Sequence, residues 1–178
     1  MLALFFLSLL LTPGAQSQTA PALKVKIDAI VRTAPGTVSL FAKNLDTGAT
    51  FALRADDRVR TASTIKLPIM VAIFAEVAAG RAKWTDEITI TAEDKVSGSG
   101  VLGNEFSPGV RLPIRDLMHL MIVLSDNTAT NLLLDRFTAD TVNAHMEKMG
   151  LAQTRSLRKI LGDGNRLKPN PSGHSAAG

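Results

Sequence analysis

Residues 120–135 read LMIVLSDNTATNLLLD, an apolar stretch interrupted by the polar corner Ser125-Asp126-Asn127. Serine, aspartate and asparagine are preferred at the N-cap of an α-helix, so the tripeptide alone predicts the start of a helix over 128–137. The preceding residues 115–124, RDLMHLMIVL, predict another strongly apolar helix. The stretch therefore indicates two helices joined by a corner that carries a hydroxyl and an amide.

A second hydroxyl stands at the head of another apolar run. Residues 63–79 read STIKLPIMVAIFAEVAA and predict a helix that is apolar all round after Lys66, as buried helices are. Ser63 and Lys66 are three residues apart, so their side chains project from one face. N–H groups at the helix start favour negative charge on the Ser63 oxygen, and the apolar run lowers the pKa of Lys66. These are the conditions for a serine nucleophile whose proton is accepted by a lysine.

The spacing Ser-x-x-Lys is weak evidence alone, because Ser156 and Lys159 repeat it. No apolar helix follows this second copy, and two further cations stand beside it, so we expect it on the surface. Ser63 and Ser125 also have a purely structural interpretation, as helix caps.

The other elements predict one domain of the α+β class, without repeats. Alternating side chains around Asp46-Thr47-Gly48 indicate a β-hairpin, and Gly150 is expected to end the last helix. The predicted elements in chain order are a helix over 21–33, hairpin strands over 37–43 and 50–54, a short strand over 84–91, a loop over 95–109 and a helix over 139–149.

Together, these motifs make the sequence resemble the class A serine β-lactamases and the related penicillin-binding transpeptidases. The resemblance covers nearly all of residues 21–155 and includes the loop Ser97-Gly98-Ser99-Gly100. It implies a helical region plus an antiparallel sheet packed with helices. It also implies an enzyme that needs no cofactor and no metal, works as a monomer and acts on a small β-lactam or a peptidoglycan stem peptide.

The resemblance assigns roles to individual residues. Ser63 is the acylated nucleophile, Lys66 accepts its proton, and Ser125 relays a proton toward the lactam nitrogen. Asn127 hydrogen-bonds the substrate's side-chain amide, and Ser99 lies with its loop at the rim of the substrate cleft. Asp126 is expected to be structural and to fix the loop between the two site residues that flank it.

Two parts of the family pattern are absent from the sequence. Class A enzymes carry a glutamate after Ser-Asp-Asn that positions the hydrolytic water, whereas residues 155–178 contain one acid, Asp163, which is either a shorter substitute or a turn residue. No Lys-Thr-Gly or Lys-Ser-Gly occurs. We therefore expect the 178 residues to be the N-terminal portion of a longer protein, truncated before the C-terminal strands and helix. We also expect the isolated product to be poorly folded and nearly inactive.

The first 20 residues carry no charge and include the apolar run 2–11, which is too short to span a bilayer. With the small residues of Ala15-Gln16-Ser17, they predict a signal peptide over 1–17, an incomplete hydrolase domain over 18–178, and a periplasmic or secreted protein. Because a basic n-region is missing, we expect the true start to lie upstream.

Composition excludes several other classes. The chain has no Cys, and its three histidines are isolated, so disulfide scaffolds, Cys nucleophiles and protein-built metal sites are not expected. Residues 21–154 hold 15 basic and 15 acidic side chains, so the net charge of +4 arises beyond them. A confined basic segment in a chain without Tyr does not predict a nucleic-acid partner.

Three functions remain open from the sequence. The first is a secreted β-lactamase that confers antibiotic resistance. The second is a penicillin-binding D-Ala-D-Ala carboxypeptidase or transpeptidase, whose acyl-enzyme is resolved by an amine or slowly by water; the missing glutamate favours it. The third is a non-catalytic remnant or cell-wall-binding module in which Ser63 and Ser125 are only caps.

Overall fold

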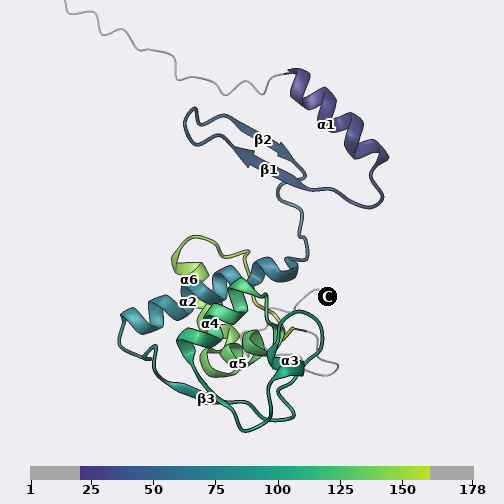
Figure 1. Cartoon of the computed structure of the whole chain (residues 1–178). Helices are drawn as coiled ribbons and strands as arrows, with labels where there is room; N and C mark the ends of the chain where they lie inside the picture. Colours follow the sequence, from purple (N-terminus) through teal and green to yellow (C-terminus); the bar gives the residue numbers. More distant parts are fainter. Residues whose placement is uncertain (1–20, 161–178) are drawn as a thin grey trace, which may run out of the picture. The chain divides into compact units, whose positions relative to one another are not determined.

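The computed structural model describes residues 21–160. The contacts within the chain divide it into two compact units, Met1–Arg60 and Thr61–Gly178. Figure 1 labels the helices α1 to α6 and the strands β1 to β3.

The first unit contains one helix and one hairpin. Helix α1 (Pro21–Thr33) has the predicted bounds, and strands β1 (Leu40–Lys43) and β2 (Thr50–Leu53) pair antiparallel. The side chain of Asn44 caps the turn by accepting the N–H groups of Asp46 and Thr47 at 2.9 and 2.8 Å. Both strands are shorter than predicted. Arg54 has a φ of 45°, outside the extended region, so β2 ends at Leu53. Because Leu53 pairs with Leu40, residues 37–39 have no partner strand.

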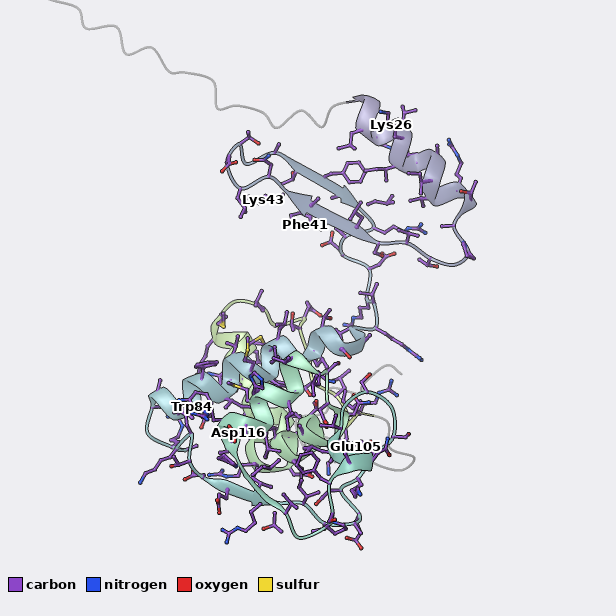
Figure 2. The ribbon with its side chains drawn as sticks, in the orientation of Figure 1. Lys26, Phe41, Lys43, Trp84, Glu105 and Asp116 are labelled. Carbon is purple, nitrogen blue, oxygen red and sulfur yellow. The ribbon has the colours of Figure 1, made fainter. Side chains whose placement is uncertain are left out.

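The hairpin covers its apolar residues unevenly. Phe51 on β2 is buried, with 8% of its surface exposed, whereas Phe41 on β1 is 62% exposed and is labelled in Figure 2. Alternate residues of a strand face opposite sides, and only one side of this hairpin is covered within the described residues.

The second unit is mostly helical. In chain order its elements are η1 (Ala62–Ile65), α2 (Lys66–Ala78), β3 (Glu87–Thr89), α3 (Leu102–Glu105), β4 (Arg111–Pro113), α4 (Ile114–Val123), α5 (Asn127–Phe137) and α6 (Ala139–Lys148). The four longer helices were all predicted from their apolar patterns. Strand β4 was not predicted, because its three residues are defined by pairing with β3. The short α3 was predicted as loop; the N–H of its first residue, Leu102, is accepted by the Asp126 carboxylate, 24 residues away.

The core of this unit lies among α2, α4 and α5, with α6 packed on α2 (Figure 1). Its fully buried side chains include Ile69, Ile73, Leu117, Met121 and Leu133. The prediction that α2 is buried all round was wrong. Leu67 and Phe74 are 53% and 50% exposed, and a hollow of about 500 Å³ lies between α2 and α4. Among residues 21–160, no helix has the length and apolar character needed to cross a membrane.

Candidate active site

The two residues of the first Ser-x-x-Lys copy lie on a continuous helical segment. Ser63 belongs to the 3₁₀ turn η1, and Lys66 is the first residue of α2. Pro68 falls in the first turn of α2, where a proline is tolerated. Ser63 is exposed, whereas Lys66 is only 2% exposed. The hydroxyl is therefore open to a ligand while the amine is enclosed by protein.

A chain of hydrogen bonds joins this amine to the Ser63 hydroxyl. Lys66 Nζ donates to the Ser125 carbonyl at 2.5 Å and to Ser125 Oγ at 2.9 Å. Ser125 Oγ in turn donates to Ser63 Oγ at 3.1 Å. The structure thus brings together the three residues predicted to be catalytic, although they come from separate parts of the sequence. Their catalytic roles stay predictions.

The surroundings of Lys66 act on its pKa in opposite directions. Burial lowers the pKa of Lys66 below its usual range because the charged ammonium is poorly solvated, and the nearby negative charge of Asp126 partly opposes this by raising it. The net effect is a lowered pKa. A larger fraction of Lys66 is then a neutral amine near neutral pH, the form that can accept a proton.

Asp126 holds the corner in place, as predicted. Its Oδ2 accepts the N–H groups of Val101 and Leu102 at 2.7 and 2.9 Å, and its Oδ1 accepts the N–H of Ala129 at 2.9 Å, which caps α5. Gly100 packs directly on this carboxylate: its φ is +111°, and a Cβ there would lie 2.3 Å from Asp126 Cγ. The structural role of Asp126 is therefore confirmed, and a glycine is required beside it.

The two residues predicted to bind substrate lie beside this corner. Asn127 is 5% exposed, and its Oδ1 accepts from Lys66 Nζ at 3.1 Å while its Nδ2 donates to the Ser97 carbonyl at 3.2 Å. Ser99 is exposed, and its carbonyl accepts the N–H of Asn127 at 3.0 Å. Asn127 thus orients Lys66 and ties the 97–100 loop to α5. Substrate binding by either residue stays a prediction.

An open hollow of about 280 Å³ adjoins the hydroxyl of Ser63. It is lined by the polar site residues and by apolar side chains of α2 and α4: Ser63, Thr64, Lys66, Leu67, Met121, Ile122 and Ser125. In the part of the chain that the structure describes, no group of three or more His, Asp or Glu side chains could hold a metal ion. The arrangement supports hydroxyl and amine chemistry.

The second Ser-x-x-Lys copy does not lie where we predicted. Ser156 is 2% exposed rather than on the surface, and its Oγ has no hydrogen-bond partner among the described residues. Its burial follows from Asn143, whose side-chain amide bonds both the N–H and the carbonyl of Ser156, at 2.7 and 3.0 Å. Lys159 forms an ion pair with Asp135 at 2.5 Å.

A contact that sequence reasoning missed follows directly after this copy. The side-chain amide of Asn131 accepts the N–H of Ile160 at 2.8 Å and donates to its carbonyl at 2.9 Å. Asn131 follows Asn127 by four residues, so the two share a face of α5, and this spacing was the available signal. Asp163, the acid weighed as a substitute for the missing glutamate, lies outside the described residues.

The sequence model of the β-lactamase enzyme family matches residues 22–176. The chain belongs to this family. A β-lactamase from Sphaerobacter thermophilus is 39% identical, with a TM-score of 0.70, over 76% of this chain and 51% of that one. The protein PBP-A is 31% identical, with a TM-score of 0.68, over 82% of this chain and 53% of its own.

The family membership confirms the resemblance and the fold class stated from the sequence. A regulatory protein, the β-lactamase regulatory protein BlaB of Streptomyces cacaoi, is 28% identical over 100 residues, which are 56% of this chain and 32% of that protein. The chain spans about half the length of the solved β-lactamase and PBP-A structures, and about a third of this curated relative.

Proposed function

We propose that Ser63 attacks the amide of a β-lactam and forms a covalent acyl-enzyme, as in a serine β-lactamase. The observation that carries the proposal is the hydrogen-bond chain from the buried amine of Lys66 through Ser125 Oγ to Ser63 Oγ. A nucleophile within hydrogen-bond reach of a base that is itself oriented by a third group is the arrangement of nucleophilic catalysis.

The proposed reaction follows from these contacts. Ser63 Oγ attacks the lactam carbonyl carbon, and its proton passes to the neutral amine of Lys66, through Ser125 Oγ or directly. The C–N bond of the lactam breaks, and Ser125 Oγ donates a proton to the leaving nitrogen, which Lys66 then replaces. The product is an ester on Ser63, with no gain or loss of protons overall.

Known relatives support the same chemistry. The structure of a PBP-A mutant is described as an acyl-enzyme complex with penicillin G; that protein is 30% identical to this chain, with a TM-score of 0.70. The similarity covers 83% of this chain and 54% of that one. We therefore take a β-lactam as the ligand class of the hollow beside Ser63.

A second candidate is a penicillin-binding D-Ala-D-Ala carboxypeptidase or transpeptidase. Asp126, the carboxylate that acts on Lys66, is fully buried, and its two oxygens accept backbone N–H groups, so it is shielded from water. Among the described residues, the hydrogen-bond network around Lys66 includes no other carboxylate. This observation favours a slowly resolved acyl-enzyme.

Labelling with a fluorescent penicillin tests the proposal in the protein expressed from its complete reading frame. We expect a covalent label on the wild type and none on Ser63→Ala. Ser156→Ala is the matched control, because it removes the hydroxyl of the second Ser-x-x-Lys copy, and it should label normally. Persistent labelling of Ser63→Ala would refute the assignment. The lifetime of the label separates the candidates, since a β-lactamase loses it rapidly.

Export and antibiotic resistance are further parts of the proposal. N-terminal sequencing of the mature protein should find a start after residue 17 and the protein in the periplasm or medium. If the protein is a β-lactamase, its expression in a penicillin-susceptible host should raise the concentration of penicillin that inhibits growth. If it is a carboxypeptidase or transpeptidase, that concentration should stay unchanged. Reading the coding sequence for an in-frame Lys-Thr-Gly tests the expectation of a longer protein.

A further inference from the structure

The loop over residues 96–102 is fastened by three consecutive residues at the start of α5. Asp126 and Asn127 bond backbone groups of Ser97, Ser99, Val101 and Leu102. The third residue is Thr128, which is only 1% exposed. Its Oγ1 accepts the N–H of Val96 at 3.1 Å and donates to the carbonyl of Val96 at 3.4 Å. Because a hydroxyl can accept and donate at once, Thr128 holds both polar groups of the residue that precedes Ser97.

Gly103 packs against the same backbone group. A Cβ at this position would lie 2.5 Å from the carbonyl oxygen of Val96 and 3.5 Å from Thr128 Oγ1. The carbonyl keeps its place only because residue 103 has no side chain. Val96 is therefore held by a buried hydroxyl and by a close glycine, while the next residues, 97–99, are exposed.

The carbonyl of Ser97 determines how the amide of Asn127 faces Lys66. A side-chain amide has a donor end, the NH₂ group, and an acceptor end, the oxygen. A carbonyl only accepts, so that of Ser97 takes the Nδ2 end of Asn127 at 3.2 Å, and Oδ1 is left to accept from Lys66 Nζ at 3.1 Å. A hydrogen bond to the charged form of a group favours that form. The orientation of Asn127 therefore helps Lys66 to keep a proton that it has accepted.

We propose that Thr128 is a positioning residue for Lys66. Its hydroxyl holds the 96–97 backbone so that the oxygen of Asn127 faces the amine. This inference rests on the proposed function, in which Lys66 takes the proton of Ser63. Thr128 bonds the loop and not the amine, so its effect is transmitted through the amide. Without the hydroxyl the amide is free to turn, Lys66 loses an acceptor, and the amine becomes a weaker base.

The test measures the rate of penicillin acylation across pH, on the protein from its complete reading frame. Thr128→Val keeps the shape of the side chain and removes the hydroxyl, whereas Thr128→Ser keeps the hydroxyl. In Thr128→Val the plateau rate should fall at least about tenfold, and the pH at which the rate levels off should move down by at least about 0.5 unit. Thr128→Ser should restore the wild-type profile. Asp126, the charged group that acts on Lys66, is unchanged in both variants.

Two further variants control for the loss of a hydroxyl and for folding. Thr130→Val is the matched control, because Thr130 is a fully buried threonine of the same helix whose Oγ1 donates within it, to the carbonyl of Asp126 at 2.6 Å. Its acylation profile should equal that of the wild type. Gly103→Ala displaces the Val96 carbonyl by another route and should shift the profile in the same direction as Thr128→Val. It decides the question if Thr128→Val does not fold, as monitored by Trp84 fluorescence.

The outcomes distinguish this inference from the function on which it rests. Absence of any label on the wild type rejects the proposed function and the inference with it. Normal wild-type labelling with an unchanged profile in Thr128→Val rejects the inference alone. A higher half-saturating penicillin concentration with an unchanged maximal rate and pH profile also rejects it, because Thr128 would then only anchor the rim of the cleft. An equal shift in Thr130→Val rejects it too, since any buried hydroxyl of α5 would then have the same effect.

Discussion

The two Ser-x-x-Lys copies have the same spacing and nearly opposite environments. In the first, the serine is exposed and the lysine is buried, and Ser125 connects them. In the second, Ser156 is buried without a hydrogen-bond partner among the described residues, while Lys159 is paired with an acid. The first copy lies on η1 and α2, and the second lies outside regular secondary structure.

The difference shows what the spacing leaves undetermined. A helix projects residues three apart from the same face, and the apolar residues that follow it enclose the lysine. Without a helix, the two side chains of the pair can point in different directions. In the second copy, the hydrogen bonds from the Asn143 side chain to the backbone of Ser156 determine that the serine is buried. Reactivity therefore depends on which member of the pair is enclosed, and the following predictions test this dependence.

The largest expected effect is on acylation when the enclosed amine is removed. Lys66→Ala takes away the proposed proton acceptor, so the rate of penicillin acylation should fall by about 10²- to 10⁴-fold. Lys159→Ala is the matched control and should change the rate by less than about threefold, because Lys159 contacts Asp135 and not the Lys66 network. Rates come from time-resolved labelling. Equal losses in both variants would show that the two copies are not functionally different.

The pH dependence of acylation should report the lowered pKa of Lys66. The neutral amine is the reactive form, so the rate should increase with pH up to that pKa, by about tenfold per unit below it, and then level off. Because burial lowers the pKa, the plateau should begin below pH 10.5, the usual value for lysine. A rate that keeps rising beyond pH 10.5 would contradict the role of burial.

A smaller effect is expected from filling the space beside Asp126. Gly100→Ala places a Cβ 2.3 Å from Asp126 Cγ, whereas Gly109→Ala, with a similar φ of +93°, meets nothing within 4 Å. Both variants carry the backbone cost of a positive φ, but only the first carries the clash. Its free energy of unfolding should therefore be lower by an additional amount of about 2 kcal/mol. Denaturant titration followed by Trp84 fluorescence measures the difference, and equal values would mean that Asp126 moves away freely.

The smallest effect concerns the orphan hydroxyl of the second copy. Ser156→Ala removes a buried oxygen without a partner, so the free energy of unfolding should rise by about 1 kcal/mol. Ser63→Ala removes an exposed hydroxyl and should change it by less than about 0.5 kcal/mol. The same Trp84 titration compares them. A clear loss of stability in Ser156→Ala would indicate that this hydroxyl has a partner.

The helices and the corner of the site were predictable because their signals are local. The bounds of α1 and the cap at Asp126 followed from apolar periodicity and N-cap chemistry. The features that were missed depend on contacts between residues that are distant in sequence. Strand β4 is defined by its pairing with β3, and the side chains of Asn131 and Asn143 bond backbone groups that lie 29 and 13 residues further along the chain. The burial of Ser156 follows from its hydrogen bonds with Asn143, and no sequence pattern around Ser156 indicated this burial.

The most direct test of the central claim is to locate the covalent adduct. The protein from its complete reading frame is incubated with a penicillin and digested with trypsin, and the peptides are sequenced by mass spectrometry. Cleavage after Arg60 and Lys66 releases residues 61–66, TASTIK, and cleavage after Arg155 and Arg158 releases residues 156–158, SLR. We predict the adduct on Ser63 within the first peptide. An adduct on the second peptide, or on any residue other than Ser63, would contradict the account.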